Sequence, residues 1–113
     1  MATFSKEFLS TSANGLPIQI AATATAGTAV HVAHATATDE LWLWATNTSI
    51  LPVVLTFEFG GTGVGNEIHV TVGANDAMLV ITGIPITNSV TVAAYAATTN
   101  VVNVYGYVNR ITA

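Results

Sequence analysis

The chain contains no cysteine and very little charge. Without cysteine, neither a disulfide framework nor a thiolate metal site is possible. Only 7% of the 113 residues are charged, whereas soluble domains average about 25%. A surface with so few ions does little to keep a free monomer in solution. The composition therefore favours a protein whose exterior is partly covered in an assembly.

Basic residues are the scarcest, with two against six acidic residues and a net charge of −4. Nucleic-acid binding depends on a basic patch or stripe, so no nucleic-acid partner is expected. Long apolar runs are also missing, and none approaches the roughly 18 residues that a membrane-spanning helix needs. No membrane partner is expected either. At 113 residues the chain has the size of one domain with one hydrophobic core.

Threonine and alanine number 18 each and valine 14, and β-branched residues favour strands. Apolar and polar residues alternate with period two in many windows, as in half-buried strands, and turn residues separate these windows. We expect strands near residues 16–24, 28–35, 40–46, 53–59, 67–72, 77–83, 89–97 and 101–108. The pattern predicts an all-β domain, an antiparallel β-sandwich or small barrel of about eight strands, and leaves jelly-roll and immunoglobulin-like strand orders open.

Residues 1–15 lack this alternation and end in the turn signal Asn14-Gly15. We interpret them as an extended N-terminal arm, and residues 16–113 as the sandwich domain. The large apolar residues of the arm, Phe4, Phe8 and Leu9, are candidates for contact with a partner.

Two of the expected strands are apolar on both faces. Trp42 and Trp44 alternate with leucine and alanine, and Tyr105 and Tyr107 alternate with valine and glycine. Tryptophan and tyrosine are favoured anchors at protein interfaces, so we interpret these four residues as interface candidates. A stacking platform for sugars, or central strands covered by loops or by the arm, are the other interpretations.

The carboxylates suggest possible acid–base chemistry. Asp39 and Glu40 are adjacent, and Glu58 and Glu67 flank the glycine-rich segment 60–66, so that a hairpin would bring these two together. The paired carboxylates of glycosidases act on either side of a bound sugar, and a sandwich this small leaves little room for the cleft. We therefore interpret them as solvated charges. The glycine segment lacks the helix and the Lys-Ser/Thr pair of a phosphate-binding loop and is interpreted as a hairpin loop.

The histidines do not form a clear metal site. His31 and His34 are three residues apart and face opposite sides of a strand. His31 could meet His69 across strands, with Glu58 or Glu67 beside them, but no close ligand spacing supports this. No Ser–His–Asp set can be assembled either. We expect no enzyme, no catalytic residue, no metal and no cofactor.

Four stretches, NGLPIQIAATATAGTAVHVA, DELWLWATNTS, VVLTFEFGG and NVVNVYGYVNR, together resemble small structural proteins of tailed bacteriophages. The resemblance extends from Asn14 to Arg110 and most implies a capsid decoration, or cement, protein. It implies a β-rich protein, commonly a homotrimer, that is made in the host cytoplasm and sits on the outer capsid surface. There it would hold neighbouring major capsid proteins together, often through a terminal arm.

The expected function is therefore that of a virion structural protein, whose partners are the major capsid protein and further copies of itself. A tail, neck or fibre component of the virion is the alternative within the same class. A carbohydrate-binding module that uses Trp42, Trp44, Tyr105 and Tyr107 is the alternative from another class.

Overall fold

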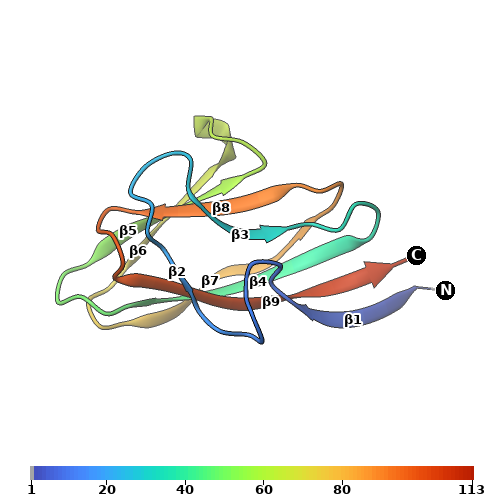
Figure 1. Cartoon of the computed structure of the whole chain (residues 1–113), viewed down its shortest axis with the longest axis horizontal. Coiled ribbons are helices and arrows are strands. Elements are labelled where there is room, and N and C mark those ends of the chain that lie inside the picture. Colours follow the sequence, from blue (N-terminus) through green and yellow to red (C-terminus); the bar gives the residue numbers. More distant parts are fainter. Residues whose placement is uncertain (1) are drawn as a thin grey trace.

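In the computed structural model, which describes residues 2–113, two antiparallel sheets pack face to face (Figure 1). Sheet A, the lower layer in Figure 1, contains β1 (Thr3–Phe8), β2 (Ile18–Gln19), β4 (Thr38–Asn47), β7 (Ala77–Ile86) and β9 (Val102–Thr112). Sheet B, the upper layer, contains β3 (Thr28–Val32), β5 (Val53–Phe59), β6 (Glu67–Val72) and β8 (Thr91–Ala96). A 3-10 turn, η1 (Val64–Asn66), precedes β6. The all-β sandwich expected from the sequence is confirmed.

The strand order is that of a jelly roll. Sheet A runs β1–β9–β4–β7, with β2 also paired to β9, and sheet B runs β3–β8–β5–β6. When β1 and β2 are counted together as one broken edge strand, eight strands remain. The first then pairs with the last (β9), β3 with β8, β4 with β7 and β5 with β6. This nested pairing is the double Greek key of jelly rolls, so the open choice of strand order is decided.

The core lies between the sheets and consists of the inward-facing member of each alternating pair. Its largest fully buried side chains are aliphatic or aromatic and come from both sheets and their connections: Leu9, Ile20, Val30, Leu41, Leu43, Leu55, Phe57, Val72, Ile81, Val92 and Val102. Burying each contributes roughly 1.5–3 kcal/mol relative to leaving it exposed. The alternation that predicted the strands is therefore also what fills the core.

Gly106 lets the two long strands of sheet A approach closely. It lies opposite Leu43, and a Cβ on Gly106 would collide with the carbonyl oxygen of Trp42 and with the backbone and side chain of Leu43. Only a residue without a side chain fits there.

Several strands differ in extent from the expectation: β9 continues to Thr112 and β3 ends at Val32. β7 continues past residue 83 through Pro85, which is tolerated because β7 is an edge strand and the missing amide hydrogen is not needed by a neighbour. β2 keeps only two residues of the expected 16–24, because the chain then leaves sheet A. The hydroxyl of Thr25 and the amide of Gly27 instead donate to the carboxylate of Glu58.

A register shift in β3 also breaks the alternation. Strict period two places Val30 and Val32 on one face and His31 on the other. The pairing with β8 slips between Ala29 and His31, so Val30 and His31 are both buried while Val32 is 41% exposed. One extra residue in a strand reverses every later side chain, which is what a β-bulge does.

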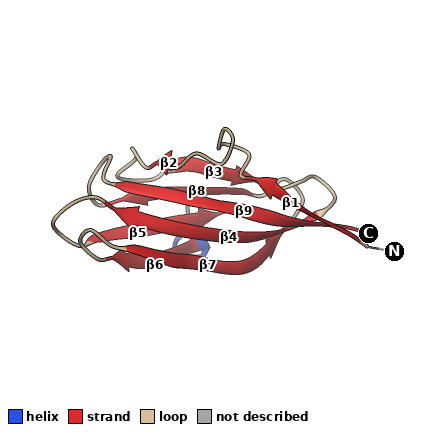
Figure 2. Ribbon diagram, turned by 90° about the horizontal axis from the view of Figure 1, so that it is seen from below, coloured by secondary structure: helices blue, strands red, loops and turns tan. Residues whose placement is uncertain are grey.

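The separate N-terminal arm is the main correction to the sequence analysis. Residues 3–8 are extended, but they form β1, which pairs with the C-terminal half of β9 in register from Thr3 opposite Thr112 to Phe8 opposite Tyr107. Figure 2 shows both termini leaving the same end of sheet A. β2 covers only the first part of the long strand β9, and β1 supplies the hydrogen bonds for the rest. Met1 lies outside the described residues.

The β1–β2 connection also closes the edge of sheet B. The Ser10 hydroxyl accepts a hydrogen bond from the amide of Val32 (2.8 Å), and the Thr11 hydroxyl donates to the carbonyl of Val30 (2.6 Å). Side chains thus replace the missing neighbour of edge strand β3. Within residues 2–113, no helix has the length and apolarity needed to cross a membrane.

Candidate interaction surface

The four aromatic residues singled out in the sequence lie side by side on the outer side of sheet A. Strands β4 and β9 are neighbours, and their register places Trp42 opposite Tyr107 and Trp44 opposite Tyr105. Leu43, between the two tryptophans, and Val104 and Val108, on either side of the two tyrosines, point into the core. Local alternation therefore sets the side on which each aromatic ring lies, and strand pairing makes them adjacent.

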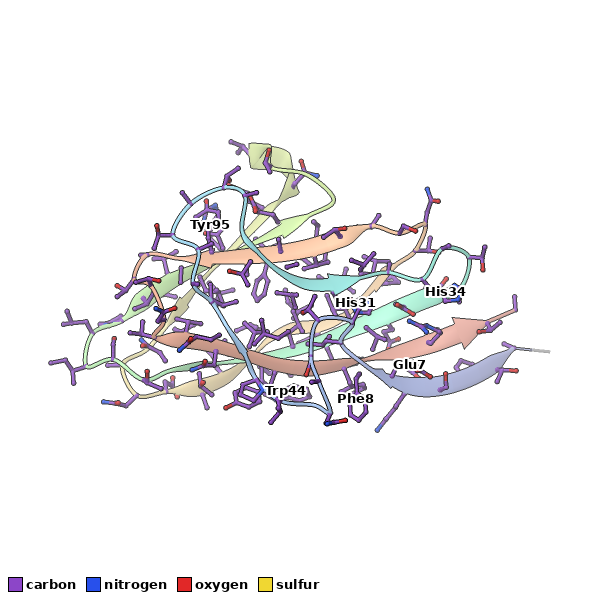
Figure 3. All side chains as sticks on the ribbon, viewed as in Figure 1. Glu7, Phe8, His31, His34, Trp44 and Tyr95 are labelled. Atoms are coloured by element: carbon purple, nitrogen blue, oxygen red, sulfur yellow. The ribbon has the colours of Figure 1, made fainter. Side chains whose placement is uncertain are left out.

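The outer strands of sheet A extend these two pairs into rows. On β1, Phe8 lies opposite Tyr107, and on β7, Leu79 lies opposite Trp44. Figure 3 shows Phe8 and Trp44 on the side of sheet A that faces away from sheet B. We call this surface the aromatic face; it consists of Phe8, Trp42, Trp44, Leu79, Tyr105 and Tyr107.

The rings of the aromatic face are packed together yet open to solvent. The rings of Trp44 and Tyr107 stack diagonally, with centroids 6.1 Å apart and planes at 29°. Phe8 is 62% exposed, Trp44 38% and Tyr105 37%. Neither Tyr105 nor Tyr107 uses its hydroxyl in a hydrogen bond within residues 2–113, so both remain available to a partner. Rings held in this way lose little conformational freedom when a partner covers them.

Trp42 is held by its neighbours more firmly than the other rings. Its indole Nε1 donates to Oε1 of Glu40 at 2.7 Å. Its six-membered ring packs over Gly83, where a Cβ would come within 3.0 Å of the ring. Gly83 has φ of +76°, a conformation that glycine adopts without strain, and it marks the bulge that separates Leu41 from Trp42 in the pairing with β7.

Polar rows border the aromatic face at both ends. On one side, Lys6 of β1 and Glu40 of β4 flank Asn109 of β9, and both are in register with it. On the other side, Gln19 and Thr46 flank Asn103 in the same manner. The ammonium of Lys6 also lies 5.1 Å from the centre of the Tyr107 ring. An apolar, aromatic centre with a polar rim is the usual anatomy of a protein interface.

The structure brings six of the seven interface candidates to this side of sheet A. Phe4 lies further along β1, opposite Ile111, and is 65% exposed. Leu9 is the exception: only 1% of its surface is exposed, because the chain turns inward after β1 and Leu9 enters the core. Its assignment to an interface was therefore wrong.

The interpretation of the carboxylates as solvated charges was wrong for Asp39, which is fully buried at the start of β4. Arg110 lies directly opposite on β9 and donates from Nε to Oδ1 of Asp39 (2.7 Å) and from Nη2 to Oδ2 (3.1 Å). His31 reaches the same Oδ2 through Nε2 at 2.8 Å, and the amide of His34 adds a contact at 3.2 Å. The cluster joins β3, β4 and β9.

Ser10, His31 and Asp39 thus meet in space, but not as a catalytic triad. The group of Ser10 that contacts His31 is its amide, which donates to Nδ1 at 3.0 Å. His31 must therefore carry its hydrogen on Nε2 and donate it to Asp39, and neither ring nitrogen is left to act as a base. His31 is 1% exposed. A catalytic histidine needs one nitrogen within reach of a nucleophile, so this arrangement is structural.

Acid should weaken the fold through this cluster. Burial raises the pKa of Asp39, but hydrogen bonds from Arg110, His31 and the amide of His34 outweigh it, and the pKa falls from 3.8 to about 2. A lowered pKa stabilises the fold above pH 3.8, and this contribution disappears as the pH falls from about 4 to about 2. We expect the free energy of unfolding to drop by about 2 kcal/mol from this group over that interval. Urea titrations at pH 5 and pH 2 measure the drop in the free energy of unfolding. An Asp39→Asn variant has no carboxyl group at this position, so its drop should be smaller by about 2 kcal/mol.

The remaining polar candidates lie on the outer side of sheet B. Glu58 and Glu67 are directly opposite, as expected, but Glu58 is buried beneath the 21–27 segment. Tyr95 donates to Oε2 of Glu67 at 3.1 Å, and His69 lies 3.2 Å from Oε1 of Glu67 and 3.0 Å from the hydroxyl of Thr56. These contacts provide hydrogen-bond partners for the side chains of Glu67, His69 and Tyr95.

His31 and His69 do not meet across strands, since β3 and β6 are opposite edges of sheet B. In the described range 2–113, no three histidine or acidic side chains converge as metal ligands. The glycine segment 60–66 joins β5 to β6 and contains only the short turn η1, as a hairpin loop does. The side chain of Asn47 is buried, and its amide nitrogen donates to the carbonyls of Leu51 and Val72.

Comparison with protein-family models, with curated proteins and with solved structures gives no match.

Proposed function

We propose that this protein is a structural component of a virion, held on the outer surface of a phage capsid by contacts with neighbouring protein subunits. The observation that carries the proposal is the aromatic face: two rows of half-buried or exposed rings with a polar rim, on a chain with only 7% charged residues. The proposed partners are the major capsid protein and other copies of this chain, and no chemical reaction is part of the mechanism.

The energetics of the aromatic face favour a protein partner. Covering apolar surface contributes about 25 cal/mol per Å², and rings such as Trp44 and Tyr107 bury large areas at little entropic cost. Most of the other outward residues of the chain are Thr, Ala and Asn, which pack closely against a flat neighbour. A lattice that presents many copies adds avidity, so that modest individual contacts suffice.

The jelly roll itself does not choose between the candidates, because it occurs in viral capsid proteins and in lectins. The capsid location rests on the resemblance to phage structural proteins. A carbohydrate-binding module is the candidate from another class, and the stacked pair of Trp44 and Tyr107 is the observation that favours it. Lys6 lies over the Tyr107 ring, however, and the Trp42 ring packs on Gly83. Neither Tyr107 nor Trp42 therefore offers a free, flat surface to a sugar.

Removing two central rings should weaken attachment to particles. The probe is a capsid that lacks this protein. We expect the double variant Trp44→Ser, Tyr105→Ser to bind it at least about tenfold more weakly than the unaltered chain does, because each central aromatic residue contributes about 2 kcal/mol or more to binding at an interface. Co-sedimentation with purified capsids measures the occupancy. Ile50→Ser is the matched control, because Ile50 is 84% exposed in the β4–β5 loop, outside the aromatic face.

Equal binding of all three proteins would remove the aromatic face from the mechanism. Quantitative mass spectrometry of intact virions separates a capsid protein, present in hundreds of copies, from a tail, neck or fibre component, present in few. Tryptophan fluorescence in the presence of saccharides addresses the other class: a saturable change, lost in the Trp44→Ser, Tyr105→Ser variant, would favour carbohydrate binding instead.

A further inference from the structure

Two neighbouring rows of this side of sheet A are symmetric about β9, although Leu79 on β7 has no counterpart on the other side of β9. Phe8 and Trp42 lie on either side of Tyr107, and Lys6 and Glu40 lie on either side of Asn109. Lys6 and Glu40 have opposite charges and are equally far from β9, one strand away on each side. The two flanking positions therefore carry complementary rather than identical groups.

This arrangement is complementary to itself under a two-fold rotation. If the axis lies along β9 in the plane of contact, the rotation keeps each row in place and exchanges its two ends. Lys6 then faces Glu40 of the partner subunit, Phe8 faces Trp42 of the partner subunit, and Tyr107 meets its own copy. Isologous contacts require this kind of match, in which one patch pairs with itself.

We propose that the occupant of the aromatic face is a second copy of this chain, bound face to face about a two-fold axis along β9. The proposal rests on the assignment of this face to protein contact and names the partner. It replaces the trimer implied by the resemblance, because a face-to-face contact of this kind closes at two subunits. Capsid contacts would then be made by other surfaces of the pair, and variants of the aromatic face would weaken attachment to capsids through the loss of bivalent binding.

The charges favour this axis over the other two-fold axis of the face. An axis running across the strands, between the two aromatic rows, would place Lys6 over Gln19 and Glu40 over Thr46 of the partner subunit, and would leave both charges opposite neutral groups. The axis along β9 gives two ion pairs per dimer. Facing sheets pack with strands about 30° apart, an offset that a long lysine side chain can span over one strand spacing.

The remaining acidic groups do not oppose the pairing. Glu58 and Glu67 lie on the outer side of sheet B, away from the aromatic face, and Asp39 is neutralised by Arg110. Glu7 alternates with Lys6 and Phe8 along β1 and lies opposite the buried Val108, and Asp76 lies in the turn before β7. The available surface suits a reversible dimer. Under this axis β7 faces no strand of the partner subunit, so three strands of about ten residues overlap and cover roughly 500 Å² in plan, less than the about 800 Å² of accessible surface that each partner buries in a standard interface.

Charge reversal tests the geometry with the full chain. Sedimentation velocity over a concentration series should show a monomer–dimer equilibrium. Lys6→Glu and Glu40→Lys, each alone, place like charges opposite each other at two points per dimer, and we expect each to raise the dissociation constant about tenfold or more. The double variant Lys6→Glu, Glu40→Lys restores opposite charges and should recover most of the dimer.

Recovery in the double variant is the decisive readout, because Glu40 also accepts a hydrogen bond from Trp42 within the subunit, and loss of that bond alone would not be repaired by changing Lys6. Ile50→Ser should dimerise normally, and circular dichroism confirms that each variant is folded. A monomer at all concentrations, a trimer, or a double variant no better than either single reversal would overturn the proposal.

The outcome separates this inference from the proposed function. A dimer with the expected charge dependence that does not bind capsids would remove the virion assignment and keep the pairing. A monomer that binds capsids through the aromatic face would remove the pairing and keep the virion assignment.

Discussion

Replacement of Gly106 by alanine should lower the free energy of unfolding by about 3 kcal/mol, at the upper end of the cost of overpacking a core. The added methyl group would collide with the carbonyl oxygen of Trp42 and with the backbone and side chain of Leu43. Backbone atoms cannot rotate away as a flexible side chain can, so β4 and β9 would have to separate at the centre of sheet A. The strands that would separate are those that carry Trp42, Trp44, Tyr105 and Tyr107.

Thermal and urea unfolding measure this effect, and the midpoint of thermal unfolding should fall by about 10 °C or more. Gly65→Ala is the matched control, because a Cβ at Gly65 would meet nothing within 4 Å. It should change the free energy of unfolding by less than about 0.5 kcal/mol. Equal stability of the two variants would contradict the close approach of β4 to β9 at Gly106.

Asp39→Ala should destabilise the fold by about 3–5 kcal/mol, the usual cost of breaking a buried ion pair from one side. The substitution leaves the guanidinium of Arg110 without its anion and the Nε2 hydrogen of His31 without an acceptor. Because His31 also holds the amide of Ser10, the loss should spread to the β1–β2 connection. Hydrogen exchange at the Ser10 and Val32 amides should become faster than in the unaltered protein.

Asp76→Ala is the control for a carboxylate at the surface. Asp76 is exposed, and its side chain accepts one hydrogen bond, from the amide of Ala77 at 2.8 Å. We expect a loss of at most about 1 kcal/mol from this variant. Comparable losses from the two substitutions would mean that the Asp39 cluster contributes no more than an ordinary surface contact.

The positions of the strands could be predicted because both signals for them are local. Period-two alternation and the turn residues between windows lie within about ten residues of each other, and each of the eight windows contains a strand of the structure. β1 was missed because its side chains are nearly all exposed, so no apolar–polar alternation marks it. The same lack of burial led to the interpretation of residues 1–15 as an arm.

The candidate surface was predictable in part. Alternation with core residues placed Trp42 and Trp44 on one side of their strand, and Tyr105 and Tyr107 on one side of theirs. That both pairs lie on the same sheet, in register, depends on the pairing of β4 with β9 across some sixty residues of chain. Phe8 joins them only because β1 occupies the free edge of β9.

The amino-acid sequence by itself determined the fold class, the approximate strands, the absence of disulfides and the scarcity of charge, because each follows from composition or from neighbours along the chain. The tertiary structure alone decided the jelly-roll order, the burial of Leu9, the bulge that exposes Val32 and the ion pair between Asp39 and Arg110. These depend on which strands meet at each sheet edge. Long-range pairing of this kind is set by the packing of the whole core, and no local pattern encodes it.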